Sequence, residues 1–196
     1  NVTARVEQIS SHDPLFYEFI CDNFINSAGL GAQDLAHNIA GVHSNQIPPL
    51  HPCKGDYFSY SGKNPFKHLI YPIPEKNHTG LGIHSTSDMS NQLRFGPDTE
   101  YIDDFNYSIN ESKRELFASA IKSYFPEVES HRLIPAYSGI RPKLNGPGNE
   151  ASDFIIQGPD VSNIDGLIQL FGMESPALTA SLAIAEYVER LLIGAQ

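Results

Sequence analysis

Residues 171–188, FGMESPALTASLAIAEYV, read as the end of a strand, a short turn with Gly172 and Pro176, and a helix made mostly of Ala and Leu. Proline is tolerated in the first helical turn because its missing N–H would have no helical acceptor there. The other N–H groups at the start of a helix stabilise negative charge. This stretch therefore predicts a helix that either packs closely on a sheet or presents its first turn to an anionic group.

The rest of the chain reads as short strands with few helices. Between residues 48 and 97, short aromatic or β-branched runs are separated by Pro and Gly, which is typical of a mixed or antiparallel sheet. We therefore expect an α+β fold with flanking helices. Strands are expected over residues 4–9, 19–25, 57–60, 68–71, 80–86, 92–95, 131–144, 153–157 and 167–171.

Two further helices are expected, over residues 30–39 and 111–125. The second has apolar residues at helical spacing, with Asn110 as its cap and Pro126 after its end. Its apolar face would carry Leu116, Phe117, Ala120, Ile121 and either Tyr124 or Phe125.

Composition excludes several classes of partner. The chain has 196 residues, a net charge of -10 and a pI near 5.1, and its 13 Lys and Arg residues are scattered, so no basic face for nucleic acid is expected. No apolar run approaches the roughly 20 residues that span a bilayer. Cys21 and Cys53 lack any metal-ligand spacing, and we expect buried thiols in a reducing compartment rather than a disulfide.

Arg141 and Lys143 form the most informative pair of charged residues. On a strand, side chains two residues apart point to the same face, and Pro142 between them fixes the backbone. A planar guanidinium beside an ammonium suits one or two carboxylates. The alternative is an arginine bonded to local carbonyls or to Asp153.

His84 stands out among the eight histidines, because GLGIHSTSD places it on an alternating strand among small residues. An imidazole there could act as a general base near neutral pH, or it could be a structural residue satisfied by its neighbours. The other histidines form no ligand-spaced cluster, so no metal site is expected.

Four motifs occur together and in order: FINSAGLGAQDLA, GLGIHSTSDMSNQLRFGPD, PAYSGIRPK with DFIIQGP, and GLIQLFGMESPALTASLAIAEYV. They resemble the carboxy-terminal half of FAD-dependent oxidoreductases of the D-amino-acid oxidase superfamily, and most closely the L-2-hydroxyglutarate dehydrogenase or oxidase group. The resemblance covers almost the whole chain from about Ala4 onward. It implies a substrate domain together with the returning strand and C-terminal helix of a Rossmann-like FAD-binding domain.

The resemblance implies oxidation of L-2-hydroxyglutarate to 2-oxoglutarate, with hydride transfer to the flavin of FAD. His84 matches the histidine expected to take the hydroxyl proton, and Arg141 matches the arginine that binds the substrate carboxylate. Lys143 would help with the second carboxylate, and Lys54 and Tyr71 would line the pocket. The residues matching the FAD-binding segments are Asn26, Ala28, Gly29, Gly172, Glu174, Ser175, Pro176, Leu178 and Thr179.

The dinucleotide-binding part of that family, with its G-x-G-x-x-G turn, has no counterpart in this sequence. We therefore expect residues 1–45 to be part of a FAD-binding domain, 46–145 a substrate-binding domain, and 146–196 the returning FAD-domain strands and helix. The expected partners are a dicarboxylate, the missing N-terminal FAD-binding half and a peripheral membrane electron acceptor. The uncovered apolar face of the C-terminal helix would favour self-association.

Two rival functions stay open. An amine or glycine oxidase of the same superfamily would oxidise a C–N bond and would not need a second cation beside Arg141. A non-catalytic dicarboxylate-binding or subunit-interaction module would bind 2-hydroxyglutarate without flavin. Expected locations are the cytoplasm, or the periphery of the inner membrane, which is mitochondrial in a eukaryote.

Overall fold

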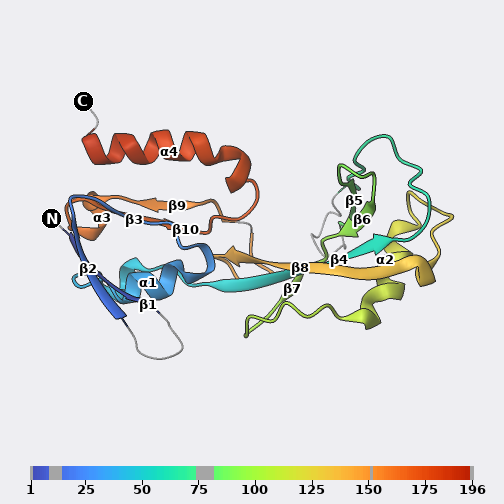
Figure 1. Ribbon diagram of the computed structural model, residues 1–196, viewed down its shortest axis with the longest axis horizontal. Helices are drawn as coiled ribbons and strands as arrows, with labels where there is room; N and C mark the ends of the chain where they lie inside the picture. Colours follow the sequence, from blue (N-terminus) through green and yellow to red (C-terminus); the bar gives the residue numbers. More distant parts are fainter. Residues whose placement is uncertain (1, 9–14, 74–81, 151, 195–196) are drawn as a thin grey trace. The chain divides into compact units, whose positions relative to one another are not determined.

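The computed structural model describes residues 2–8, 15–73, 82–150 and 152–194 (Figure 1). The chain divides into two compact units. Unit 1 comprises residues 1–51 and 142–196, and unit 2 comprises residues 52–141. The boundaries between the units therefore lie after residue 51 and after residue 141. The sequence suggested boundaries after residue 45 and after residue 145.

Unit 1 is built on a three-stranded sheet with the order β3-β10-β9. β3 (Phe24–Asn26) runs parallel to the central β10 (Leu167–Phe171), and β9 (Ile155–Gln157) runs antiparallel to it. Every residue of β10 is buried, as expected for a central strand covered on both faces. The bounds of β10 confirm the strand expected over residues 167–171.

Helices cover this sheet. The apolar side of α4 (Ala177–Ile193) packs on it through Ile184 and Val188, which contact a cluster that includes Ile168 and Leu170 (Figure 1). Ala32 and Ala36 of α1 (Ala32–His37) pack in a second cluster with Phe171. The remaining short helices of unit 1 are η1 (Gly29–Gly31), η2 (Ser44–Gln46) and α3 (Pro159–Ser162).

β1 (Val2–Gln8) and β2 (Leu15–Cys21) form a separate antiparallel pair in unit 1. The single strand expected over residues 19–25 was wrong, because β2 ends at Cys21 and β3 begins at Phe24. Asp22 and Asn23 lie between them, and both residue types favour bends by bonding to nearby backbone. The sequence His12-Asp13-Pro14 predicts a turn, and these residues lie outside the described ones.

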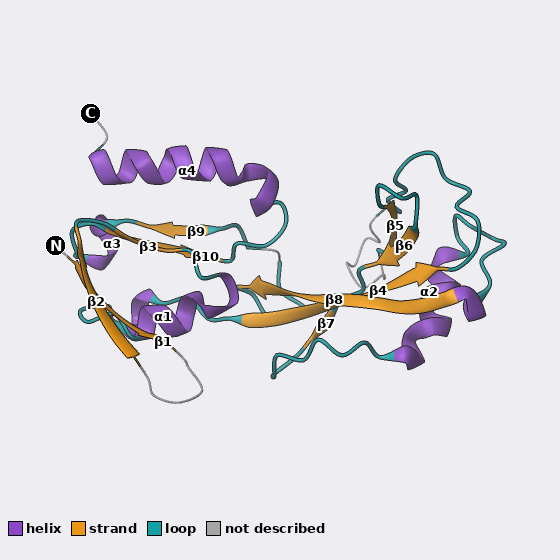
Figure 2. Cartoon of the chain, in the orientation of Figure 1, coloured by secondary structure: helices purple, strands orange, loops and turns teal. Residues whose placement is uncertain are grey.

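Unit 2 contains a largely antiparallel sheet (Figure 2). Its path is β5 (His84–Ser87), β6 (Leu93–Gly96), β4 (His51–Tyr60) and β7 (Glu100–Tyr101), and β8 (Leu133–Lys143) also pairs with β4. The strand expected over residues 68–71 was wrong. That segment makes only one isolated bridge, between Ile70 and Ser85, and Tyr71 is followed by Pro72, which cannot donate to a ladder.

The core of unit 2 lies where α2 (Arg114–Ile121) covers the sheet. Phe58, Phe95 and Phe117 are all fully buried there. η3 (Glu111–Lys113) leads into α2, and the expected cap is confirmed, since the Asn110 side chain accepts a bond of 3.1 Å from the Ser112 N–H. η4 (Ser130–Arg132) precedes β8.

Two details of the helix expectation were wrong. Leu116 is 51% exposed, whereas Ala118 is buried, so the buried face of α2 is rotated from the expected one. The helix also ends at Ile121 rather than at residue 125. Residues 122–125 continue in tighter turns, in which the Ser123 N–H donates to the Ala120 carbonyl and the Tyr124 N–H to the Ile121 carbonyl.

The observed arrangement confirms the α+β class. Cys53 is buried as expected, whereas Cys21 is only half-buried. Among the helices in the described ranges, none has the length and apolarity needed to cross a bilayer.

Candidate functional site

Arg141 lies on β8 in unit 2, where its guanidinium is held from one side. Its Nη2 donates a hydrogen bond of 2.7 Å to the main-chain carbonyl of Asp98. Gly55 on β4 makes the space for it, since a Cβ at that position would lie 2.7 Å from Nη2 and 2.6 Å from the Pro97 Cβ. One edge of the guanidinium is thus bonded to a nearby carbonyl, which was the alternative to carboxylate binding. The guanidinium has five donors, and this bond engages one edge of it.

The imidazole of His84 lies on the adjacent Tyr71 ring. The ring centroids are 3.9 Å apart, with an interplanar angle of 29°. Burial lowers the pKa of His84, and the positive charge of Arg141 lowers it further. A histidine with a lowered pKa is neutral near pH 7, which is the form that accepts a proton.

Two tyrosines complete this neighbourhood. Tyr57 on β4 stacks on Tyr137 of β8, with centroids 4.4 Å apart and planes 14° apart. Burial raises the pKa of Tyr57, and Tyr137 raises it further, whereas the charge of Arg141 opposes both. The Arg141 cluster, defined as Arg141, His84, Tyr71, Tyr57 and Tyr137, therefore combines one cation, one neutral base and phenol donors.

Sequence reasoning missed Tyr57 and Tyr137. The available signal was alternation on β4, where Tyr57 lies between the buried Asp56 and Phe58 and so faces away from the core. That pattern marks a half-exposed tyrosine but does not show that it lies near Arg141.

Lys54 belongs to a buried ionic network rather than to an open pocket wall. The side chain of Lys54 is 6% exposed, and its ammonium donates to the Ser108 carbonyl and lies 3.5 Å from the Asp56 carboxylate. Lys113 binds the same Asp56 carboxylate at 3.0 Å. The ammonium of Lys54 is therefore already engaged within unit 2.

The first predicted FAD-binding segment lies at the end of β3 in unit 1. Asn26 is fully buried, its Nδ2 donates a 2.8 Å bond to the Ala32 carbonyl, and its Oδ1 accepts a 3.3 Å bond from the Ala28 N–H. Gly29 has a φ of +59°, and a Cβ there would meet no atom within 4 Å. Asn26 thus shapes a turn whose glycine borders open space.

The second predicted segment joins β10 to α4. Gly172 has a φ of +71°, and a Cβ there would lie 2.8 Å from Leu144, so the tight turn requires glycine. Ser175 and Pro176 precede the helix, and no side chain caps it. The Thr179 hydroxyl donates to the Pro176 carbonyl at 2.8 Å.

Lys143 is engaged with this second turn. Its ammonium lies 2.8 Å from the Glu174 carboxylate, and the two side chains are 21% and 16% exposed. Lys143 was expected to bind substrate and Glu174 to bind FAD. In unit 1 the two side chains form an ion pair with each other.

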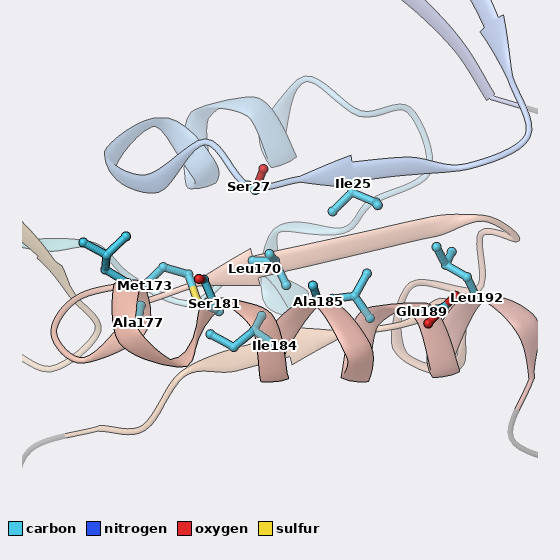
Figure 3. A pocket seen from close by; sticks show the side chains of 12 residues that line it. Ile25, Ser27, Leu170, Met173, Ala177, Ser181, Ile184, Ala185, Glu189 and Leu192 are labelled. Carbon is cyan, nitrogen blue, oxygen red and sulfur yellow. The ribbon is translucent and has the colours of Figure 1, made fainter.

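An apolar groove of about 540 Å³ runs along α4 in unit 1 (Figure 3). Ser27 borders it at the end of β3, and Ala177 and Leu178 border it in the first turn of α4. The two predicted FAD-binding segments, far apart in sequence, therefore approach the same groove. Its other walls come from Ile25, Leu170, Met173, Ser181, Ile184, Ala185, Val188, Glu189 and Leu192.

Comparison with known proteins decides the family. The sequence profile of the family described as FAD dependent oxidoreductase matches residues 3–191. The chain belongs to this family. Its members depend on FAD, which agrees with the cofactor expected from the sequence motifs.

Similar curated proteins share one name. L-2-hydroxyglutarate dehydrogenase, mitochondrial, of Arabidopsis thaliana is 45% identical over 183 residues, which cover 87% of this chain and 38% of the plant protein. The Homo sapiens protein of the same name is 24% identical over 207 residues, covering 86% of this chain and 44% of the human protein. The chain thus spans less than half the length of these two relatives.

Solved structures support the fold. The dithionite-reduced L-alpha-glycerophosphate oxidase of Mycoplasma pneumoniae, with FAD bound, superposes with a TM-score of 0.69 at 22% identity, over 87% of this chain and 42% of that one. Glycine oxidase of Bacillus cereus gives a TM-score of 0.61 at 14% identity, over 99% of this chain and 50% of that one. At these identities the likeness concerns the fold.

The residues present fit part of a FAD site. The uncapped start of the 17-residue α4 supplies backbone donors with no acidic residue in its first turn, and Gly29 leaves open space at the other segment.

Within the described part of the chain, no three His, Cys, Asp or Glu side chains gather as metal ligands would.

Proposed function

We propose that this chain supplies the substrate-binding part of an enzyme that oxidises L-2-hydroxyglutarate to 2-oxoglutarate. The observation that carries the proposal is the Arg141 cluster, in which Asp98 holds one edge of the guanidinium and Tyr71 orients the His84 imidazole, with ring centroids 3.9 Å apart. The lowered pKa of His84 agrees with this placement. A 2-hydroxy acid needs such a pair, a cation for the carboxylate and a neutral base for the hydroxyl proton. The names of the curated relatives support the substrate.

Arg141 would bind a substrate carboxylate through the guanidinium donors that Asp98 does not use. His84 would take the proton from the C2 hydroxyl as the C2–H bond breaks, so that the carbonyl of 2-oxoglutarate forms. When bound, FAD supplies the two-electron acceptor for the hydride from C2. Tyr71 and Tyr57 would border the substrate and limit the access of water to His84.

In unit 1, the turn shaped by Asn26, Ala28 and Gly29 would hold the cofactor. The turn formed by Gly172, Glu174, Ser175 and Pro176, with Leu178 and Thr179 after it, would also hold it. The donors of α4 would stabilise negative charge on the reduced ring system. We assign Lys143 either to a second substrate carboxylate or to holding the turn through Glu174.

The apolar groove along α4 suits packing against protein rather than against phosphate. Its lining is mostly aliphatic, and Leu178 is 89% exposed. We therefore propose that the partner of this face is a complementary FAD-binding segment, in the same or another polypeptide. The names of the relatives support a mitochondrial location.

The test is the visible absorption spectrum of the chain mixed with FAD, before and after adding L-2-hydroxyglutarate. A protein-bound flavin band that bleaches with this substrate supports the proposal, whereas bleaching by glycine or another amine indicates the amine-oxidising alternative. If no flavin binds, titration calorimetry with L-2-hydroxyglutarate decides whether the chain binds substrate. No heat of binding would contradict the assignment of Arg141.

Variants sharpen this test. Arg141→Met should weaken L-2-hydroxyglutarate binding roughly 10- to 150-fold, since hydrogen bonds to charged groups are worth about 1.5–3 kcal/mol. Arg114→Met is the matched control, because it removes the same charge from a surface pair with Glu111 and should leave binding unchanged. His84→Gln should leave binding nearly intact while abolishing most turnover in a flavin-loaded protein, and turnover equal to that of the wild type would contradict the role of His84 as the base. A flavin-loaded wild-type chain that binds L-2-hydroxyglutarate without turnover would indicate the non-catalytic binding module.

A further inference from the structure

Asp98 connects Arg141 to the buried ionic network of unit 2. Its carboxylate accepts a 2.6 Å bond from the Asp56 N–H and a 2.6 Å bond from the Lys113 ammonium. Its main-chain carbonyl accepts the 2.7 Å bond from Arg141 Nη2. Because Asp98 is 2% exposed, its side chain and backbone are fixed together. The carboxylate therefore sets where the acceptor for Arg141 lies.

Lys113 is the central cation of this network. Its ammonium binds the carboxylates of Asp56, Asp98 and Glu100 at 3.0, 2.6 and 2.6 Å. Burial alone would lower the pKa of Lys113, but its bonds to these three carboxylates outweigh burial and raise it. Removing Lys113 would take away the cation bound to the buried Asp98 carboxylate and leave Asp56 with Lys54 at 3.5 Å, which is unfavourable.

Gly55 supplies the other constraint on the guanidinium. An added Cβ would contact Arg141 Nη2 at 2.7 Å, the Pro97 Cβ at 2.6 Å and the Asp98 carbonyl oxygen at 3.1 Å. The Cβ position is therefore already surrounded by the two partners of the Arg141–Asp98 bond. Any larger residue at 55 must separate them or displace the segment that contains Pro97.

We propose that Gly55 and the Asp98–Lys113 ion pair are positioning elements that hold Arg141 ready for a carboxylate. The role rests on the proposed function, since it gives Arg141 a carboxylate to bind. Fixing one edge of a long, flexible side chain before binding reduces the conformational entropy lost on binding. The edges of the guanidinium that Asp98 does not occupy would face the ligand.

The test compares two glycine-to-alanine variants of the whole chain. Gly55→Ala should displace Arg141, whereas Gly139→Ala is the control, because Gly139 lies on β8 near Arg141 and a Cβ there would meet no atom within 4 Å. The first readout is the NMR signal of the Arg141 side-chain N–H groups in the ligand-free protein, assigned by its loss in Arg141→Lys. The second readout is the affinity for L-2-hydroxyglutarate.

We expect Gly55→Ala to shift or broaden the Arg141 signal and to weaken binding about tenfold or more, as expected for a disrupted charge-assisted contact. Gly139→Ala should match the wild type in both readouts. An unchanged Arg141 signal in Gly55→Ala would overturn the positioning role. If the wild type binds no dicarboxylate, the proposed function fails, but the Arg141 signal still decides the positioning role.

Gly55→Ala could fail to fold, and Lys113→Met then provides a second route. Methionine is unbranched and one atom shorter than lysine, so this variant keeps most of the side chain and removes the cation that holds Asp98. The Arg141 signal should again shift, and Lys113→Arg should restore it, because a guanidinium can bind the same carboxylates. A Lys113→Met protein that is folded and has the wild-type Arg141 signal would contradict the link through Asp98.

Discussion

The imidazole of His84 lies nearly parallel to the ring of Tyr71, with the centroids 3.9 Å apart. Tyr71 is itself 60% exposed, so it shields one face of the imidazole from water while remaining at the surface. This arrangement accounts for part of the burial that lowers the pKa of His84. It also orients the ring, which a proton acceptor requires.

His84 should therefore titrate below the ordinary histidine value of about 6.5. Tyr71→Ala removes part of the burial and Arg141→Met removes the nearby positive charge, so each variant should raise the pKa of His84. Proton-detected NMR titration of the imidazole in the three proteins measures this directly. A wild-type pKa at or above that of the unfolded chain would contradict the assignment of His84 as a neutral base.

The same shift affects stability. Because the folded-state pKa is lowered, the unfolded chain binds the proton first as the pH falls. The stability linked to His84 is therefore fully present above about pH 6.5 and is lost as the pH falls through the lowered pKa. In chemical denaturation at a series of pH values, His84→Gln should flatten this part of the profile.

Individual strands and helix caps could be predicted from the sequence, but the side chains that they bring together from distant parts of the chain could not. Local signals were sufficient for β10 and for the Asn110 cap, because each depends on neighbouring residues. The partners of Lys113 are 57, 15 and 13 residues away in sequence, and which carboxylates meet depends on how β4, β6 and β7 pair. Tyr57 was missed for the same reason.

The pair formed by Lys143 and Glu174 allows its two proposed roles to be separated. If Lys143 mainly holds the turn before α4, a double-mutant cycle with Lys143→Met and Glu174→Gln should give a coupling of about 0.5–3 kcal/mol in unfolding free energy. L-2-hydroxyglutarate binding would then change little in Lys143→Met. A coupling near zero together with a large loss of binding would instead assign Lys143 to the second carboxylate.

Phe117 and Leu116 are adjacent on α2 but have opposite environments. Phe117 is fully buried against Phe58, with ring centroids 4.7 Å apart, whereas Leu116 is 51% exposed. Phe117→Ala should destabilise unit 2 by about 3–5 kcal/mol through lost burial and a residual cavity. Leu116→Ala should cost no more than about 0.5 kcal/mol. Similar losses in denaturant unfolding would mean that the buried face of α2 is the one first expected from the sequence.

Two exposed leucines of α4 should make the isolated chain associate with itself. Leu178 and Leu182 are 89% and 80% exposed and lie one turn apart, and Leu178 lines the apolar groove. Contiguous apolar surface of this kind is normally covered in a soluble protein. Sedimentation velocity should show association that increases with concentration.

The double variant Leu178→Ser and Leu182→Ser should shift the chain toward the monomer. Leu116→Ser is the matched control, because it removes an exposed leucine from unit 2 and should leave association unchanged. A wild-type chain that stays monomeric at all concentrations would contradict the prediction. Equal association in the double variant would place the contact on another surface, such as the exposed apolar residues of β2.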